Sequence, residues 1–214
     1  MYTFAPTSQS RRSAQTVLWH ITETLVRLVA PILSFTADEV WEYLPAVEGR
    51  EASVHLAHFP TPEEIFSEDP APLLKEWRVL LEVRDHALLH LEVARQAKVI
   101  GKALEAEIDI TPSWEAEPLL QKHASSLKEI INVSKVTLKR PLRGRHSEIM
   151  SLGATPKFSD CLFDARTASG HKCARCWNYM PEVSNYGIWQ NVCTRCHDAL
   201  KEMKIDPPTE AIQE

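Results

Sequence analysis

Two short cysteine motifs, Cys173-Ala-Arg-Cys176 and Cys193-Thr-Arg-Cys196, decide how the C-terminal part of this 214-residue chain folds. Sixteen residues separate them, which is enough chain for a loop that folds back as a hairpin. Zn²⁺ takes four ligands in a tetrahedron, and each C-x-x-C turn supplies two thiolates. We therefore predict one structural zinc ion held by Cys173, Cys176, Cys193 and Cys196, with no open position for catalysis.

Other interpretations of the cysteine pairs remain open at this point. Iron in a rubredoxin-like site uses similar pairs, and a C-x-x-C motif can also be a redox group. Cys161 is expected to be a small buried apolar residue instead of a fifth ligand. His171 and His197, which flank the motifs, are expected on the surface or behind the ligands, and Asn185-Tyr-Gly187 offers a turn between the two pairs.

The N-terminal part has the apolar periodicity of helices. A helix is predicted over 11–30, with Thr7 or Ser8 as its cap, and Pro31 ends it. Thr36-Ala37-Asp38-Glu39 has the pattern of a capping box and predicts a second helix that ends at Pro45. Residues 46–74, with four prolines and an acidic cluster, predict an irregular connection.

A second long helix is predicted over 75–100, with Gly101 as the glycine that follows its end. Residues 104–110 then alternate polar and apolar side chains, as a half-buried strand does, and residues 133–138 alternate again. A short helical stretch lies between these two segments. The fold class predicted is mainly α, with a small α/β unit and a C-terminal zinc ribbon or knuckle.

The composition, with 44% hydrophobic and 25% charged residues, is that of a globular protein. Without a stretch long enough to span a membrane or an apolar leader, the expected location is the cytoplasm, and a monomer is expected. Residues 1–132 carry a net charge of −8 and residues 133–214 a net charge of +3. A polyanion should therefore prefer the C-terminal third, above all Lys135 to Arg145, which holds five basic residues.

Three segments resemble isoleucyl-tRNA synthetases of the bacterial type. The first begins at Arg12-Ser-Ala-Gln-Thr-Val-Leu and continues to Leu28-Val-Ala-Pro-Ile-Leu-Ser-Phe-Thr-Ala-Asp-Glu-Val-Trp41, and it is similar to the helical anticodon-binding domain of class I synthetases for branched aliphatic amino acids. The second is Arg95-Gln-Ala-Lys-Val-Ile-Gly101 with Leu104-Glu-Ala106, similar to the junction of the isoleucine enzyme. The third is Lys172-Cys-Ala-Arg-Cys-Trp177 with the second cysteine pair; this tail distinguishes the isoleucine enzyme from the valine enzyme.

The resemblance implies a division into five parts. These are the C-terminal part of a helical anticodon-binding domain (1–62), a long helix with a small α/β junction (63–140), a connecting segment (141–165), a zinc finger (166–204) and a tail (205–214). The implied partner is isoleucine-accepting tRNA. Bases of a single-stranded anticodon are read by aromatic stacking and arginine hydrogen bonds, with basic side chains on phosphates.

The resemblance implies that Arg175 and Trp177 contact the anticodon. The further RNA-binding candidates come from their charge and position: Lys172, Arg195, Arg11, Arg12, Lys139 and Arg140. Arg143 and Arg145 belong to the same basic run as Lys139 and Arg140. For each of these side chains, an ordinary solvated surface position is the alternative.

The HIGH-like and KMSKS-like signatures that bind ATP in the family do not occur in this sequence, and neither does the editing domain. The chain should therefore activate no amino acid by itself, and ATP would bind only to a catalytic domain outside it. Two other functions stay open. One is a detached RNA- or protein-binding zinc module. The other is a DNA-glycosylase-type zinc-finger fragment, against which the sequence Tyr2-Thr3 after Met1 speaks, because those enzymes begin Pro-Glu.

Overall fold

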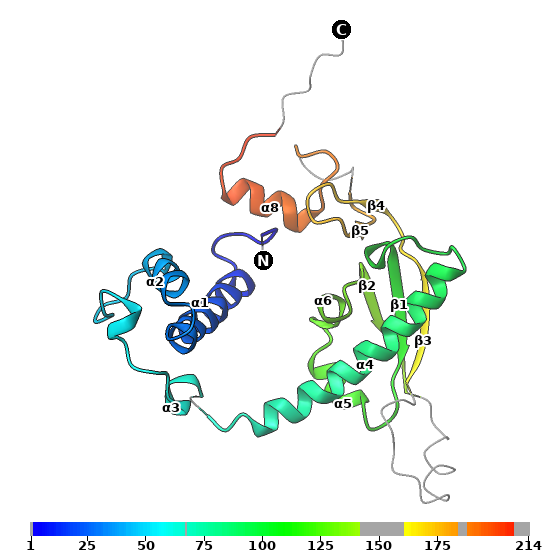
Figure 1. The fold of residues 1–214 in the computed structure, drawn as a ribbon. Helices are drawn as coiled ribbons and strands as arrows, with labels where there is room; N and C mark the ends of the chain where they lie inside the picture. The colour runs from blue at the N-terminus through cyan, green and yellow to red at the C-terminus, as the bar shows by residue number, and fades with distance from the viewer. Residues whose placement is uncertain (1, 67, 142–160, 184–187, 208–214) are drawn as a thin grey trace, which may run out of the picture. The chain divides into compact units, whose positions relative to one another are not determined.

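The computed structural model describes residues 2–66, 68–141, 161–183 and 188–207. The chain divides into two compact units, Met1–Pro70 with Ala199–Ile205 and Ala71–Asp198 with Asp206–Glu214. Figure 1 shows the order of the helices and strands along the chain. Helices make up the described part of the first unit, and the second unit adds a small mixed sheet.

Helix α1 (Gln9–Val29) lies close to where the sequence predicts it. The Ser8 hydroxyl caps its start by accepting a hydrogen bond from the Arg11 amide at 3.3 Å. This bond satisfies one of the amides that the first helical turn leaves without a partner. Pro31 follows the last helical turn, so both predicted ends are confirmed to within two residues.

Helix α2 (Ser34–Tyr43) ends as predicted, but its predicted capping box is wrong. Thr36 lies inside the helix, and the N-cap is Leu33, which supplies no side-chain hydrogen bond. Its Trp41 is almost fully buried and donates from Nε1 to the Glu51 carbonyl at 2.9 Å. The Arg50 guanidinium lies 4.6 Å from the centre of the Trp41 ring. Trp41 is therefore the anchor of the core of this unit.

Much of the apolar periodicity of α1 is not covered by the described residues. The core of the first unit contains Val26, Ala30, Ala37, Trp41 and Val54. In contrast, five apolar residues that recur along α1 are between 47% and 55% exposed: Val17, Leu18, Ile21, Leu25 and Leu28. The unit is completed by a 3₁₀ turn, η1 (Val54–Leu56), and the short helix α3 (Pro62–Ile65).

Helix α4 (Ala71–Gln96) starts four residues before the predicted position and ends four residues before the predicted end. Pro72 fits in its first turn, where a missing amide costs nothing. The residue in the left-handed conformation that follows its end is not Gly101 but Lys98, two positions beyond Gln96, whose φ is +57°. The Lys98 amide donates to Arg95 and the Val99 amide to Ala94, which closes the helix with two backbone bonds.

The second unit contains a three-stranded sheet with the order β2-β1-β3. After the 3₁₀ turn η2 (Ala103–Glu105), β1 (Ala106–Thr111) pairs in parallel with β2 (Lys135–Leu138). Between them lie two short helices, α5 (Glu117–Lys122) and α6 (Leu127–Ile131), where the sequence predicts one helical stretch. Strand β3 (Leu162–Thr167) pairs antiparallel with β1 and was not predicted. In the core of the unit, apolar side chains of α4 are packed with Ile108 and Ile110 of β1.

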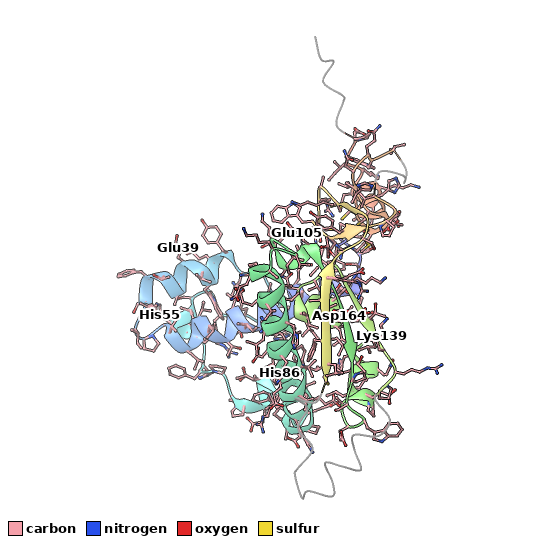
Figure 2. All side chains as sticks on the ribbon, turned by 90° about the vertical axis from the view of Figure 1, so that its right-hand side faces the viewer. Glu39, His55, His86, Glu105, Lys139 and Asp164 are labelled. Atoms are coloured by element: carbon pink, nitrogen blue, oxygen red, sulfur yellow. The ribbon has the colours of Figure 1, made fainter. Side chains whose placement is uncertain are left out.

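Strand β1 is covered on both faces, and not on one as predicted. Glu107 and Asp109, on the face opposite Ile108, pair with Arg166 of β3 at 2.7 and 2.9 Å. The Lys139 ammonium lies 3.0 Å from Oδ2 of Asp109, the same oxygen that Arg166 contacts at 2.9 Å. The Arg166 guanidinium beside it lowers the pKa of Asp109 to about 2, and Lys139 contributes in the same direction. Figure 2 labels Lys139 and Asp164 on this part of the sheet.

Three elements complete the described part of the chain: β4 (His171–Lys172), β5 (Tyr179–Met180) and α8 (Thr194–Glu202). Strands β4 and β5 form an antiparallel hairpin in which Lys172 lies opposite Tyr179. Among the helices of the described residues, none has the length and apolar character that crossing a membrane requires.

Candidate metal centre

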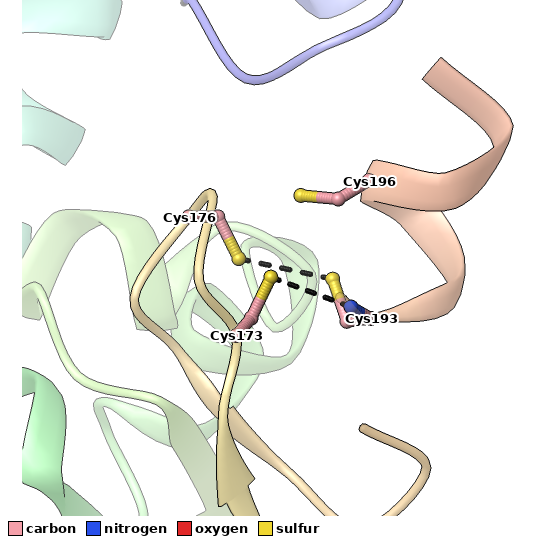
Figure 3. Close-up of side chains that lie close together, drawn as sticks. All are labelled: Cys173, Cys176, Cys193 and Cys196. Atoms are coloured by element: carbon pink, nitrogen blue, oxygen red, sulfur yellow. Dashed lines mark hydrogen bonds between the residues drawn. The ribbon is translucent and has the colours of Figure 1, made fainter. Parts of the chain in front are cut away.

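The four motif cysteines come from two local structures that face each other (Figure 3). Cys173 and Cys176 lie in the turn between β4 and β5, where the Cys173 amide donates to the Asn178 carbonyl at 2.9 Å. Cys193 immediately precedes α8 and Cys196 lies in its first turn. A hairpin turn and a helix start thus each present two sulfur atoms.

The four sulfur atoms lie within 4.8 Å of one another, and all four thiols are free of disulfides. The Sγ atoms of Cys176 and Cys193 are 3.7 Å apart. Four thiolates at about 2.3 Å from a tetrahedral zinc ion would lie about 3.8 Å from one another. In addition, the Cys193 amide donates to the Cys173 sulfur at 3.3 Å. The donor set and its spacing therefore fit a four-coordinate zinc ion.

The close sulfur atoms shift one another's pKa in opposite directions. Hydrogen bonds from Cys193 and Cys196 lower the pKa of Cys176, and the contact with Cys176 raises the pKa of Cys193 and of Cys196. Burial opposes the charge on Arg195, but the charge of Cys176, a hydrogen bond with it and the charges of Cys196 and Cys193 together outweigh burial and raise the pKa of Arg195. Four thiolates around Zn²⁺ leave a net charge of −2, so a cation at Arg195 partly offsets that charge.

The finger has a small apolar core of its own. Val183, Trp189 and Val192 are buried, as are Cys173, Cys193 and Cys196. Cys161, in contrast, belongs to the apolar core around the three-stranded sheet, as the sequence predicts for a buried residue that is not a ligand. His171 is exposed, and Nδ1 of His197 lies 3.3 Å from the Asp198 carboxylate. The predicted turn at Asn185–Gly187 lies outside the described residues.

Trp177 does not pack into this core. Its side chain is 59% exposed, and its backbone has a φ of +65°, a conformation that a bulky residue rarely adopts. The Trp177 amide donates to the Cys173 carbonyl at 2.9 Å, which closes the turn around the cysteines. The Lys172 ammonium lies 5.6 Å from the centre of the Trp177 ring. Next to the cysteine cluster, the exposed indole thus has a cation over one of its faces.

The other predicted RNA-binding residues occupy varied positions. Arg175 and Arg195 are half-buried in the finger, and Arg140 is exposed beyond the end of β2. Lys139 pairs with Asp109, as described above. Arg11 and Arg12 belong to the first unit, where Arg11 donates to the Phe4 carbonyl at 3.3 Å and Arg12 is exposed. Arg143 and Arg145 lie outside the described residues.

Two residues near the cluster were missed in the sequence. The Ser134 hydroxyl accepts a hydrogen bond from the Tyr179 amide at 2.7 Å, and so joins the three-stranded sheet to the hairpin that carries the first cysteine pair. Trp189 supplies most of the finger's apolar core. No local pattern marks Ser134, because its partner is 45 residues away. For Trp189, its place between the two cysteine pairs was an available signal.

Comparison with known proteins defines the class. The family model described as the anticodon-binding domain of tRNA ligase matches residues 1–111. The chain therefore belongs to the family of tRNA ligase anticodon-binding domains.

More particularly, the chain is similar to proteins named isoleucine–tRNA ligase. It is 37% identical to that of Desulforamulus reducens, over 94% of this chain and 21% of the relative. It is 38% identical to that of Glaesserella parasuis, over 91% and 20%, and 37% identical to that of Moorella thermoacetica, over 96% and 22%. The chain thus spans about a fifth of the length of these relatives.

Proposed function

We propose that this chain is the anticodon-recognising portion of an isoleucyl-tRNA synthetase and that its zinc finger contacts the anticodon of isoleucine-accepting tRNA. The matching family supports a role in tRNA binding. The identity to isoleucine–tRNA ligases over more than nine-tenths of this chain supports the choice of amino acid. The attachment of isoleucine with ATP would take place on a catalytic domain, and the removal of wrong products on an editing domain, neither of which these residues supply.

The observation that carries the proposal is the first cysteine turn. Its backbone holds Trp177 with the ring exposed, and Lys172 lies over one face of that ring, which leaves the other face for a base. An unpaired base can stack on the indole, since every base has a π-face, while a cation contacts the adjoining phosphate. Arg175, between the two cysteines of the turn, has the donors needed for a base edge. A fixed turn lowers the entropy cost of presenting these groups.

In this proposal, Cys173, Cys176, Cys193 and Cys196 hold one structural Zn²⁺ that fixes the turn. The ion supplies cross-linking, because four thiolates leave it no free position for a substrate. Arg195 is placed to offset the negative charge of the cluster and can also face a phosphate. Lys139, Arg140, Arg11 and Arg12 are secondary candidates for phosphate contacts.

The uncovered face of α1 has a place in the same proposal. Its five exposed apolar residues would be costly in water for an isolated helix, and large exposed apolar surfaces mark interaction sites. We propose that other helical parts of a longer synthetase chain cover this face. The helices of residues 1–62 would then belong to a larger anticodon-binding bundle, followed by the junction at 63–140, the connecting segment at 141–165, the finger at 166–204 and the tail.

The test is to compare four single variants of the zinc-loaded chain for binding to an isoleucine tRNA transcript. Arg175→Ala and Trp177→Ala should each weaken binding by about 1–3 kcal/mol. Arg78→Ala, at an exposed arginine of α4, is the control for the lost charge. Trp114→Ala is the control for the lost ring, because Trp114 is 55% exposed and Trp177 is 59% exposed.

Equal affinities for Arg175→Ala and Arg78→Ala would refute the role of Arg175. Equal affinities for Trp177→Ala and Trp114→Ala would refute the role of Trp177. If the chain instead binds DNA and RNA equally, without regard to the tRNA, the zinc-module alternative would replace the proposal.

A further inference from the structure

The hairpin that carries the first cysteine pair is tied to the three-stranded sheet by one buried hydroxyl. Ser134 lies directly before β2 and is only 3% exposed. Its hydroxyl donates to the Leu104 carbonyl at 2.5 Å and accepts from the Tyr179 amide at 2.7 Å. Its own amide donates to the Ala106 carbonyl at 3.0 Å. Through its side chain, Ser134 therefore connects η2 with strand β5, and its backbone amide adds the start of β1.

The bond to Tyr179 lies at a decisive position of the hairpin. Tyr179 is paired with Lys172, so the anchored residue lies opposite the residue that precedes Cys173. It also follows Trp177 by two positions. The hairpin and the cysteine turn are one hydrogen-bonded structure. A movement of the Tyr179 backbone relative to the sheet would therefore also move Lys172, Cys173 and Trp177.

The backbone around this bond has little freedom to compensate. A Cβ atom on Gly170, whose φ is +90°, would lie 2.3 Å from the Met180 carbonyl carbon, so the two backbone segments touch. The amide of Ala168 donates to the Glu105 carbonyl at 2.7 Å. The Glu105 carboxylate accepts from the Gly101 amide at 2.7 Å, which lowers the pKa of Glu105; Figure 2 labels this residue, the last of η2 and the one directly before β1.

We infer that Ser134 is a positioning residue for anticodon recognition: its hydroxyl fixes the orientation of the cysteine hairpin on the sheet, so that Lys172, Arg175 and Trp177 present one arrangement to the RNA. This inference rests on the proposed function for the identity of the ligand. The claim that Ser134 fixes the orientation of the hairpin rests only on the hydrogen bonds of its hydroxyl to Leu104 and Tyr179. Without the hydroxyl, the partly buried Tyr179 amide loses its acceptor, and the cost of an unsatisfied donor favours a shift of the hairpin toward another partner.

The experiment uses the full zinc-loaded chain with Ser134→Ala, Ser134→Thr and the control Ser125→Ala at an exposed serine. Residual dipolar couplings report the orientation of the hairpin amides relative to the sheet amides, and hydrogen exchange reports the Tyr179 amide. In parallel, binding is measured for an isoleucine tRNA transcript and for the same transcript with its anticodon bases replaced. Bound zinc per chain is measured for every variant.

In Ser134→Ala we expect one zinc per chain, changed couplings in the hairpin alone and faster exchange at Tyr179. The preference for the unaltered anticodon should fall about fivefold or more, the lower end of what a lost base contact produces. Ser134→Thr, which keeps the hydroxyl, should retain the preference, and Ser125→Ala should match the original chain.

Unchanged couplings and exchange in Ser134→Ala would overturn the inference whatever the RNA does. Changed couplings with an unchanged anticodon preference would show that the hydroxyl orients the hairpin but not for recognition, and would also overturn it. If the original chain shows no anticodon preference, the proposed function fails, and the couplings alone then decide whether Ser134 sets the orientation of the hairpin.

Discussion

The carboxylate of Asp109 should stabilise the second unit by a measurable amount. It lies within 3.0 Å of both Arg166 and Lys139, and its own side chain is only 12% exposed. These cations lower its pKa from 3.8 to about 2, which alone corresponds to about 2.4 kcal/mol. Because Arg166 is 41% and Lys139 51% exposed, solvent screens both pairs. We therefore expect Asp109→Asn to lower the free energy of unfolding by about 1 kcal/mol at pH 7.

The pH dependence of this loss has a definite sign. A carboxylate with a lowered pKa in the folded state stabilises the fold above its unfolded pKa. The difference between the original chain and Asp109→Asn should therefore stay constant from pH 7 to pH 5. It should shrink as the pH falls below about 4 and vanish below about 2. Loss of zinc in acid affects both proteins, so it cancels in the difference.

The assay is urea unfolding followed through the amide signals of Ile108 and Ile110, which report the sheet. Asp164→Asn is the matched control, because Asp164 is 80% exposed and lies 3.7 Å from the same Arg166. The control should change the free energy of unfolding by less than about 0.5 kcal/mol. Equal losses for Asp109→Asn and Asp164→Asn, or a difference that persists in acid, would refute the reasoning.

Three further predictions concern the metal, the first unit and the end of α4. A chelator should remove one metal ion per chain, which elemental analysis would identify as zinc and not iron. It should also abolish the hydrogen-exchange protection of the finger amides but not that of the α1 amides. A finger that stays folded without metal would contradict this prediction. Trp41→Ala should destabilise the first unit by about 3–5 kcal/mol, measured through the α1 amides, because it removes the central core side chain; a loss below about 1 kcal/mol would show that the core lies elsewhere. Lys98→Gly should raise the free energy of unfolding of the second unit by about 0.5 kcal/mol. Glycine avoids the cost of a positive φ, and this gain should exceed the loss from its greater freedom in the unfolded chain. A lower free energy of unfolding in urea would contradict this prediction.

The features that were predicted correctly depend on neighbours along the chain. Ser8 and Pro31 set the ends of α1 through contacts within four residues. The two C-x-x-C pairs predicted that four sulfur atoms could converge, because each pair is a single tight turn. The alternating pattern of residues 133–138 likewise predicted the position of β2.

Apart from the end of α4, the features that were missed depend on distant partners. The end of α4 was misplaced because backbone bonds to Arg95 and Ala94 hold Lys98 at a positive φ, a conformation for which the sequence favours a glycine. Strand β3 alternates apolar and charged residues from Phe163 to Arg166, but only its pairing with β1 makes it a strand. The exposure of the α1 face was also not predictable, since periodicity shows that a face is apolar and not what covers it.

The most direct test of the central claim is the binding of the zinc-loaded chain, at one fixed salt concentration, to an isoleucine tRNA transcript and to the same transcript with its anticodon bases replaced. Salt must be fixed because phosphate contacts make the affinity depend on it. We predict tighter binding to the unaltered transcript, by about tenfold or more, and loss of this preference when zinc is removed. Equal binding to both transcripts by the zinc-loaded chain would contradict the claim that these residues recognise the anticodon.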